Sequence, residues 1–170
     1  MARRANTVTR LYSEHALAIL ADRLPIFLNG DTGPEVRDDL ALAALLGGLN
    51  VANASTCLPH RLQQAMGVVS GARISHGRGL AMVYPEWLRQ AYPYAASDFD
   101  AIGRILGSDD IHRAAAGMLS HLGISGTLRE YGFHRKHLDL LVGSVTGNTD
   151  NDPIPGLDYG TLLGVFEACL

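Results

Sequence analysis

The chain has 170 residues and a formal net charge of −3 at pH 7; hydrophobic residues make up 47% of it and charged residues 18%. This length and apolar content allow a buried core without disulfides and exclude a disordered chain. Its arginines are scattered rather than gathered on a basic face, and no uninterrupted apolar run reaches about 18 residues. Neither nucleic acid nor a membrane is therefore expected as a partner.

The two cysteines and the N-terminal sequence favour a reduced, cytoplasmic location. Cys57 and Cys169 have no short spacing of the kind that marks a disulfide framework or a metal motif. Arg3 and Arg4 stand near the N-terminus, but the apolar segment of a secretory signal does not follow them.

The first half of the chain shows helical spacing of its apolar residues. From Val8 to Leu28 these residues recur every three or four positions, which predicts a helix apolar around much of its girth and therefore buried. Pro34 suits a first helical position and opens a second helix over about 34–54. Gly47 and Gly48 inside it lower helix propensity and suggest a close approach by a neighbouring backbone.

Two further helices are predicted, each with a histidine near its start. Leu58 to Val69 is the third helix, with Pro59 in its first turn. The fourth begins at His76, with Ser75 as its N-cap. Pro85 is expected to kink or end this fourth helix.

The remaining sequence predicts further helical segments with a Ser, Thr or Asp at the start or a glycine at the end. No period-2 alternation predicts a strand, and no repeat or linker interrupts the chain. We therefore expect one all-α helical-bundle domain of about seven or eight helices over 1–170. The later segments are 97–106 after Ser97, 108–123 capped by Ser108 and ended by Gly123, 127–131 ended by Gly132, 134–145, and a final helix with Asp158 as N-cap.

His60 and His76 are the candidate metal ligands. Two helices joined by a short turn can bring both imidazoles to one point, and imidazole binds Fe, Zn, Cu and Ni. The alternative, from the residues alone, is two unrelated histidines, one near a helix start and one exposed.

The residues around this pair resemble the signature of the iron-containing (group III) alcohol dehydrogenases. The resemblance covers nearly the whole chain, but only the C-terminal helical domain of that family. The residues at 57–63, CLPHRLQ, most resemble the phosphonoacetaldehyde reductase branch. The matching elements are Asn53-Ala54-Ser55, His60, Gly67, His76-Gly77, Tyr84-Pro85, the segment 122–132 and Asn151-Asp152-Pro153-Ile154-Pro155.

The resemblance implies a metal-dependent oxidoreductase of which this chain is one part. In the family an Asp and three His hold the metal, Fe²⁺ or Zn²⁺, and two of these His positions fall on His60 and His76. The Asp and the first His are then expected before residue 1, as is an α/β domain that binds NAD(P). Gln64 stands where the family often has another His near the nicotinamide.

Arg61, Arg73 and Arg78 flank the histidines. Guanidinium groups bind phosphonate or phosphate through paired hydrogen bonds, so Arg61 and Arg78 are candidates for binding an anionic substrate. The alternative is that these are solvated surface arginines. Cys57 is interpreted as a small apolar filler beside the site.

The other histidines are predicted to have no role in the site. His15 is expected in the core or at an interface, and the exposed helix faces are expected to carry the rest: His112, His121, His134 and His137. His134 and His137 are spaced to meet as a pair.

Two functions remain open from the sequence. The first is the metal-binding C-terminal domain of an NAD(P)-dependent alcohol dehydrogenase or aldehyde reductase, completed by an N-terminal half and acting on a small aldehyde or alcohol. The second is a non-catalytic remnant that folds and associates with itself or a partner through an exposed apolar surface.

Overall fold

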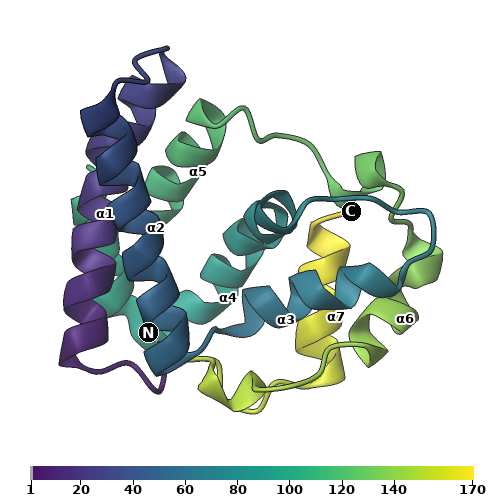
Figure 1. Ribbon diagram of the computed structural model, residues 1–170. Helices are drawn as coiled ribbons and strands as arrows, with labels where there is room; N and C mark the ends of the chain where they lie inside the picture. The colour runs from purple at the N-terminus through teal and green to yellow at the C-terminus, as the bar shows by residue number, and fades with distance from the viewer. Residues whose placement is uncertain (1) are drawn as a thin grey trace. The chain divides into compact units, whose positions relative to one another are not determined.

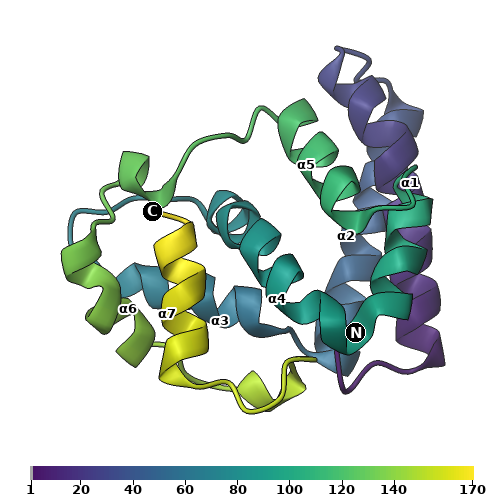
Figure 2. The same ribbon diagram turned by 180° about the vertical axis from the view of Figure 1, so that it is seen from behind.

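The computed structural model describes residues 2–170, and its regular elements are all helical (Figures 1 and 2). Across residues 2–170 there are seven α-helices and no strand, which confirms the prediction of an all-α fold of about seven or eight helices. The α-helices are α1 (Thr7–Leu28), α2 (Pro34–Ala54), α3 (Leu58–Ala65), α4 (His76–Ile105), α5 (Ile111–His121), α6 (Leu138–Gly143) and α7 (Tyr159–Ala168). The 3₁₀ turns are η1 (Met66–Val68), η2 (Leu128–Tyr131), η3 (Arg135–His137) and η4 (Thr149–Asn151).

The chain forms two compact units. The first unit contains the residues up to Ser55 together with Ala95–Leu122, and the second contains Thr56–Tyr94 and Gly123–Leu170. Helix α4 belongs to both, and its backbone leaves the helical conformation at Ala95, with φ −150° and ψ 35°. The candidate metal ligands both lie in the second unit.

In the first unit, α1 and α2 lie side by side as a helical hairpin (Figures 1 and 2). A capping box opens α1. The Asn6 side chain accepts a hydrogen bond from the Thr9 backbone N–H, and the Thr9 hydroxyl accepts one from the Asn6 backbone N–H. The two helices pack around a small core of Ala16, Ala43 and Leu46.

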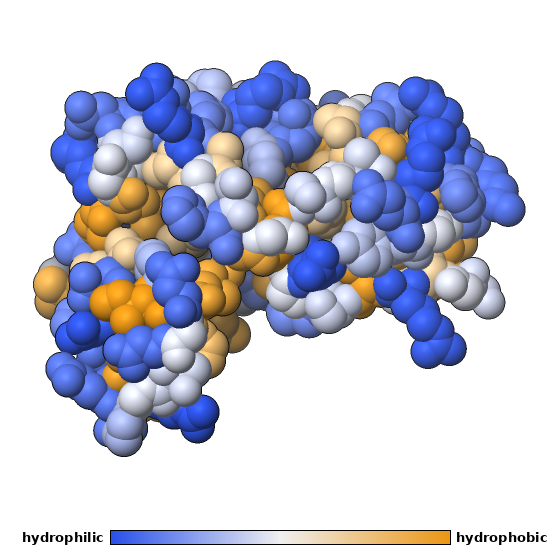
Figure 3. Space-filling view, turned by 90° about the horizontal axis from the view of Figure 1, so that it is seen from above, coloured by the Kyte–Doolittle hydropathy of each residue, from blue (hydrophilic) through white to orange (hydrophobic). Residues whose placement is uncertain are grey.

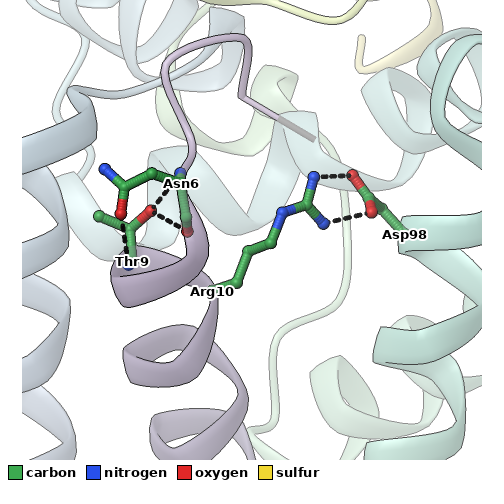
Figure 4. A network of polar contacts seen from close by, with 4 residues as sticks. All are labelled: Asn6, Thr9, Arg10 and Asp98. Atoms are coloured by element: carbon green, nitrogen blue, oxygen red, sulfur yellow. Dashed lines mark hydrogen bonds and ion pairs between the residues drawn. The ribbon is translucent and has the colours of Figure 1, made fainter.

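An ion pair links α1 to the part of α4 in the same unit (Figure 4). The Arg10 guanidinium donates to both carboxylate oxygens of Asp98, at 2.5 and 3.2 Å. This hydrogen-bonded guanidinium lowers the pKa of Asp98 to about 2. The pair therefore contributes stability above pH about 4, where an unfolded Asp is ionised, and loses it as the pH falls toward 2.

Hydrophobic residues of the α1–α2 hairpin remain at the surface, and the prediction that α1 is buried is wrong. Val8 and Leu11 are 53% and 59% exposed, and Leu45 on α2 is 60% exposed. A Cβ added at Gly47 or Gly48 would meet nothing within 4 Å, so the predicted close approach is also wrong. Each helix is covered on the side facing the other, and its apolar residues extend beyond that side. Figure 3 shows hydrophobic residues exposed among hydrophilic ones.

Within residues 2–170 no single helix is long and apolar enough to cross a membrane. Taken together, α2 and the segment Leu58–Val68 have the length and composition of a membrane span.

In the second unit, the side chain of Asp152 is fully buried and ties α3 to α4. Its Oδ2 accepts the Leu58 N–H at 2.7 Å and the Trp87 indole N–H at 3.0 Å. Its Oδ1 accepts the Ile154 N–H at 3.1 Å. Leu58 is the first residue of α3, so Asp152 satisfies an N–H that has no acceptor within the helix.

Asn151 contacts the two residues that precede α3. Its side-chain amide donates to the Thr56 carbonyl at 3.3 Å, and its own carbonyl lies 3.8 Å from the Cys57 thiol.

Helix α6 packs on both α3 and α7. The hydrophobic side chains of this unit that are less than 2% exposed include Leu58, Leu62, Val83, Trp87, Leu128, Phe133, Leu141, Val165 and Phe166.

The predicted starts of α3 at Leu58 and α4 at His76 are confirmed, but α4 does not end at Pro85. Helix α4 continues through Pro85 and Pro93 and breaks only at Ala95. A proline inside a helix removes one backbone hydrogen bond. Buried side chains on both sides of Pro85 hold the helix in place: Val83, Trp87, Leu88 and Ala91.

The start of α5 also differs from the prediction. Its N-cap is Asp110, whose carboxylate accepts from the N–H groups of His112 and Arg113, and not Ser108. The Ser108 hydroxyl instead accepts the Asp110 N–H at 3.1 Å. The predicted Asp158 cap of α7 is confirmed, as are the glycines that end helical segments at 123 and 132, both with positive φ.

Replacing Asp152 with Ala should destabilise the second unit by about 2–4 kcal/mol, because the Leu58 and Trp87 N–H groups would lose a buried acceptor. Trp87 is the single tryptophan, so urea unfolding followed by its fluorescence reports on this unit. Asp150→Ala, an exposed neighbour, is the control. Equal midpoints for the two variants would contradict the role assigned to Asp152.

Candidate metal centre

The structure brings the two candidate ligands together. His60 lies in the first turn of α3, His76 is the first residue of α4, and their ring centroids are 5.5 Å apart with the planes at 60°. A tetrahedral ion with bonds to nitrogen of about 2.1 Å would hold two imidazole centroids about 5 Å apart. The separation of the rings therefore fits two ligands of one ion.

A close contact between α3 and α4 accounts for this arrangement. A Cβ added at Gly79 would lie 2.9 Å from Gln63 Cγ and 3.3 Å from Met66 Sδ, so only glycine fits there without a shift. Pro59 starts α3 in the conformation that the first turn requires. The two helix starts that carry the histidines are thereby held next to each other.

Gln63 is a site residue that the sequence reasoning missed. Its Oε1 lies 2.6 Å from Nδ1 of His76, whereas Gln64, the residue named from the sequence, is exposed. Gln63 follows His60 by three positions on α3, so the two side chains share a helix face. That spacing is the signal that could have identified it.

The surroundings of His60 favour the neutral form of its imidazole, which is the form that binds a metal. Burial lowers its pKa, and the neighbouring His76 and Arg61 lower it further. A lowered pKa keeps the imidazole neutral to lower pH, and only the neutral ring has a lone pair to donate.

The two histidines do not make a complete metal site. Over residues 2–170 no group of three or more His, Cys, Asp or Glu side chains is placed to hold a metal ion. Protein zinc sites use three or four protein ligands. The donor set present here fits half of such a site.

Arg61 and Arg78 are half-buried, and each donates one hydrogen bond to a neighbouring side chain. Arg61 donates to the Thr56 hydroxyl at 2.7 Å, and Arg78 donates to the Tyr131 hydroxyl at 2.9 Å. Gly147 leaves room for the Arg61 guanidinium, because a Cβ there would lie 2.9 Å from Nη1. Arg61 Nε is buried and has no hydrogen-bond partner among the described residues.

Arg73, the third flanking arginine, is exposed. It lines a cavity of about 500 Å³ together with Gln63, Ser75 and Phe133. Gln63, which contacts His76, thus also lines this cavity.

The remaining histidines are outside this site. His15 is exposed, which excludes a place in the core, so a place at an interface stays a prediction. His134 and His137 do meet as predicted, with ring centroids 5.7 Å apart, and His137 Nδ1 accepts the His134 N–H at 3.2 Å. The predicted exposure is confirmed for His112, His121 and His134, whereas His137 is partly buried.

Cys57 lies at the start of α3 and is not activated. Burial, and then the proximity of Asp152, raises the pKa of its thiol to about 12. This agrees with its interpretation as a filler beside the site.

A sequence profile described as "Fe-containing alcohol dehydrogenase family, C-terminal" matches residues 1–155. The chain belongs to this family. It corresponds to the C-terminal domain, as the resemblance of its histidine motifs implied. A comparison with curated protein sequences gives no match.

Several solved structures share the fold of this chain. A 1,3-propanediol oxidoreductase superposes with a TM-score of 0.91 at 20% identity, and the iron-containing alcohol dehydrogenase of Corynebacterium glutamicum with 0.87 at 20%. An alcohol dehydrogenase of Oenococcus oeni gives 0.88 at 17%. Each match covers 99% of this chain and 47% of the other, so the chain spans about half the length of these proteins.

The thiols of Cys57 and Cys169 should react slowly with iodoacetamide. At pH 8 we expect Cys57 to be alkylated at least about 100-fold more slowly in the native chain than in urea, because little thiolate forms at a pKa of about 12. Cys169, whose pKa burial also raises to about 12, is an internal comparison. Peptide mass spectrometry over a time course measures both sites, and equal rates for Cys57 in the two states would contradict this description.

Proposed function

We propose that this chain is the metal-binding C-terminal half of an NAD(P)-dependent alcohol dehydrogenase or aldehyde reductase. The observation that carries the proposal is the meeting of His60 and His76 at a centroid separation of 5.5 Å. Membership of the Fe-containing alcohol dehydrogenase family supports the reaction class.

His60 and His76 would hold a divalent ion, Fe²⁺ or Zn²⁺. When bound, such an ion polarises the oxygen of an aldehyde or alcohol and favours hydride exchange with a nicotinamide. The remaining ligands, an Asp and a His, and the nucleotide-binding domain would come from an N-terminal half. The 47% coverage of the solved structures is consistent with this division.

The residues of this chain would bind and orient rather than transfer protons. His60 is kept neutral and so is available as a ligand. Gln64, exposed on α3, is proposed to lie near the nicotinamide. Its amide does not titrate, so a proton relay would need a different group.

The substrate is proposed to be a small anionic aldehyde of the phosphonoacetaldehyde type. The resemblance of residues 57–63 to that branch of the family supports this choice. Arg61 and Arg78 are proposed as anion-binding residues, since each uses one side-chain hydrogen bond within the protein and guanidinium has five N–H donors.

A second candidate is a non-catalytic domain that binds a partner or a second copy of itself. The exposed apolar residues of α2 favour it: Leu42, Leu45 and Leu49 are 40%, 60% and 38% exposed, and no charged residue occurs from 40 to 55. Such a surface is typical of an association site. This candidate requires no metal, so a metal titration separates it from the first.

Titration with Co²⁺ or Zn²⁺ tests the metal site directly. We expect the chain to bind one ion at the His60–His76 pair, and His60→Ala/His76→Ala to lose at least about 10-fold in affinity by calorimetry. The matched control is His134→Ala/His137→Ala, which removes another imidazole pair at a similar separation, 5.7 Å. Equal binding by wild type and His60→Ala/His76→Ala would contradict the proposed function.

The anionic substrate is tested in the enzyme reconstituted with its N-terminal half. Arg61→Ala and Arg78→Ala should each lower kcat/KM for an anionic aldehyde by about 10-fold or more, because a charge-assisted hydrogen bond contributes about 1.5–3 kcal/mol. A neutral aldehyde of the same size should be affected less. If both aldehydes were affected equally, these arginines would have no part in recognising the anion.

A further inference from the structure

We propose that Gln63 is a positioning residue that fixes His76 in the Nδ1–H tautomer, leaving Nε2 as the atom that binds the metal. The effect of Gln63 on metal affinity rests on the proposed metal-binding function. The state of the ring is, however, a property of this chain without metal.

The hydrogen bond determines the tautomer. Gln63 Oε1 lies 2.6 Å from His76 Nδ1, and because an amide oxygen only accepts, this contact is a hydrogen bond when Nδ1 carries the proton. A neutral imidazole has one N–H, and the lone pair is therefore on Nε2. A histidine that binds a metal typically donates its other N–H in this way, and loss of the acceptor weakens metal binding by about 10- to 100-fold.

The position of Gln63 is itself constrained by packing. Gly79, in the first turn of α4 after His76, approaches so closely that a Cβ there would lie 2.9 Å from Gln63 Cγ. Gln63 is partly buried, whereas its neighbour Gln64 is exposed. The packing of α4 on α3 therefore holds the amide next to the His76 ring.

This constraint matters because His76 is exposed. Within the described part of the chain, Gln63 is the one side chain hydrogen-bonded to the His76 ring. An exposed ring without this bond would rotate and exchange tautomers. With it, α3 supplies one ligand, His60, and also orients the second.

The experiment is ¹⁵N–¹H correlation of the imidazole nitrogens in the metal-free chain at pH 8, combined with Co²⁺ titration. We expect the Nδ1–H tautomer for His76 in the wild type and its loss in Gln63→Met, which keeps the length of the side chain and removes the acceptor. Gln63→Glu retains an acceptor and should restore the Nδ1–H tautomer. Gln64→Met is the matched control and should leave the tautomer as in the wild type.

In the titration, Gln63→Met should bind Co²⁺ about 10- to 100-fold more weakly than the wild type, and Gln63→Glu should recover most of that loss. An Nε2–H tautomer in the wild type, or the same tautomer in wild type and Gln63→Met, would overturn the inference. If the tautomer changes as expected while the wild type binds no Co²⁺, the positioning by Gln63 stands and the proposed metal function fails.

Discussion

The candidate site depends on the hydrogen bonds of the buried Asp152 side chain. Helix α3 begins at Leu58 after Cys57, whose side chain provides no cap. Asp152 takes the place of the cap from 94 positions further along the chain, and the same oxygen accepts the indole N–H of Trp87 on α4. A fully buried polar group of this kind is stable only when its partners are in place. Asp152 therefore links the two helices that carry the histidines.

A close contact at Gly79 also brings the two histidines near each other. Gly79 lets α4 approach Gln63 on α3 and Met66 in η1, and the His60 and His76 rings meet edge to face, with centroids 5.5 Å apart. The two histidines thus come from helix starts whose positions are restrained by Asp152 and by the glycine contact. This rigid support is what a metal site needs, because ligand geometry must be held to fractions of an ångström.

The helical fold and the two histidines were predictable from the sequence because their signals are local. Pro59 marks the first turn of α3, and Ser75 precedes the first residue of α4, His76. The role of Asp152 was not predictable from spacing, since a cap supplied from 94 positions away leaves no local pattern. Gln63 was missed because the resemblance drew attention to Gln64.

The errors also have physical causes. The prediction at Pro85 considered the backbone hydrogen bond that proline removes and not the buried residues around it, Trp87 among them, which keep α4 continuous. For α1, apolar residues at Val8 and Leu11 show which face favours burial. They do not show whether the described residues supply the covering surface, and here they leave both side chains exposed.

The proposed metal site takes two of its ligands from this chain, one at the start of α3 and one at the start of α4. The most direct measurement is a crystal of the chain soaked in Co²⁺, with anomalous diffraction recorded at the cobalt edge. We expect an anomalous peak between the two rings, about 2.1 Å from Nε2 of His76 and from a ring nitrogen of His60. The absence of a peak there, or cobalt bound only at His134 and His137, would contradict it.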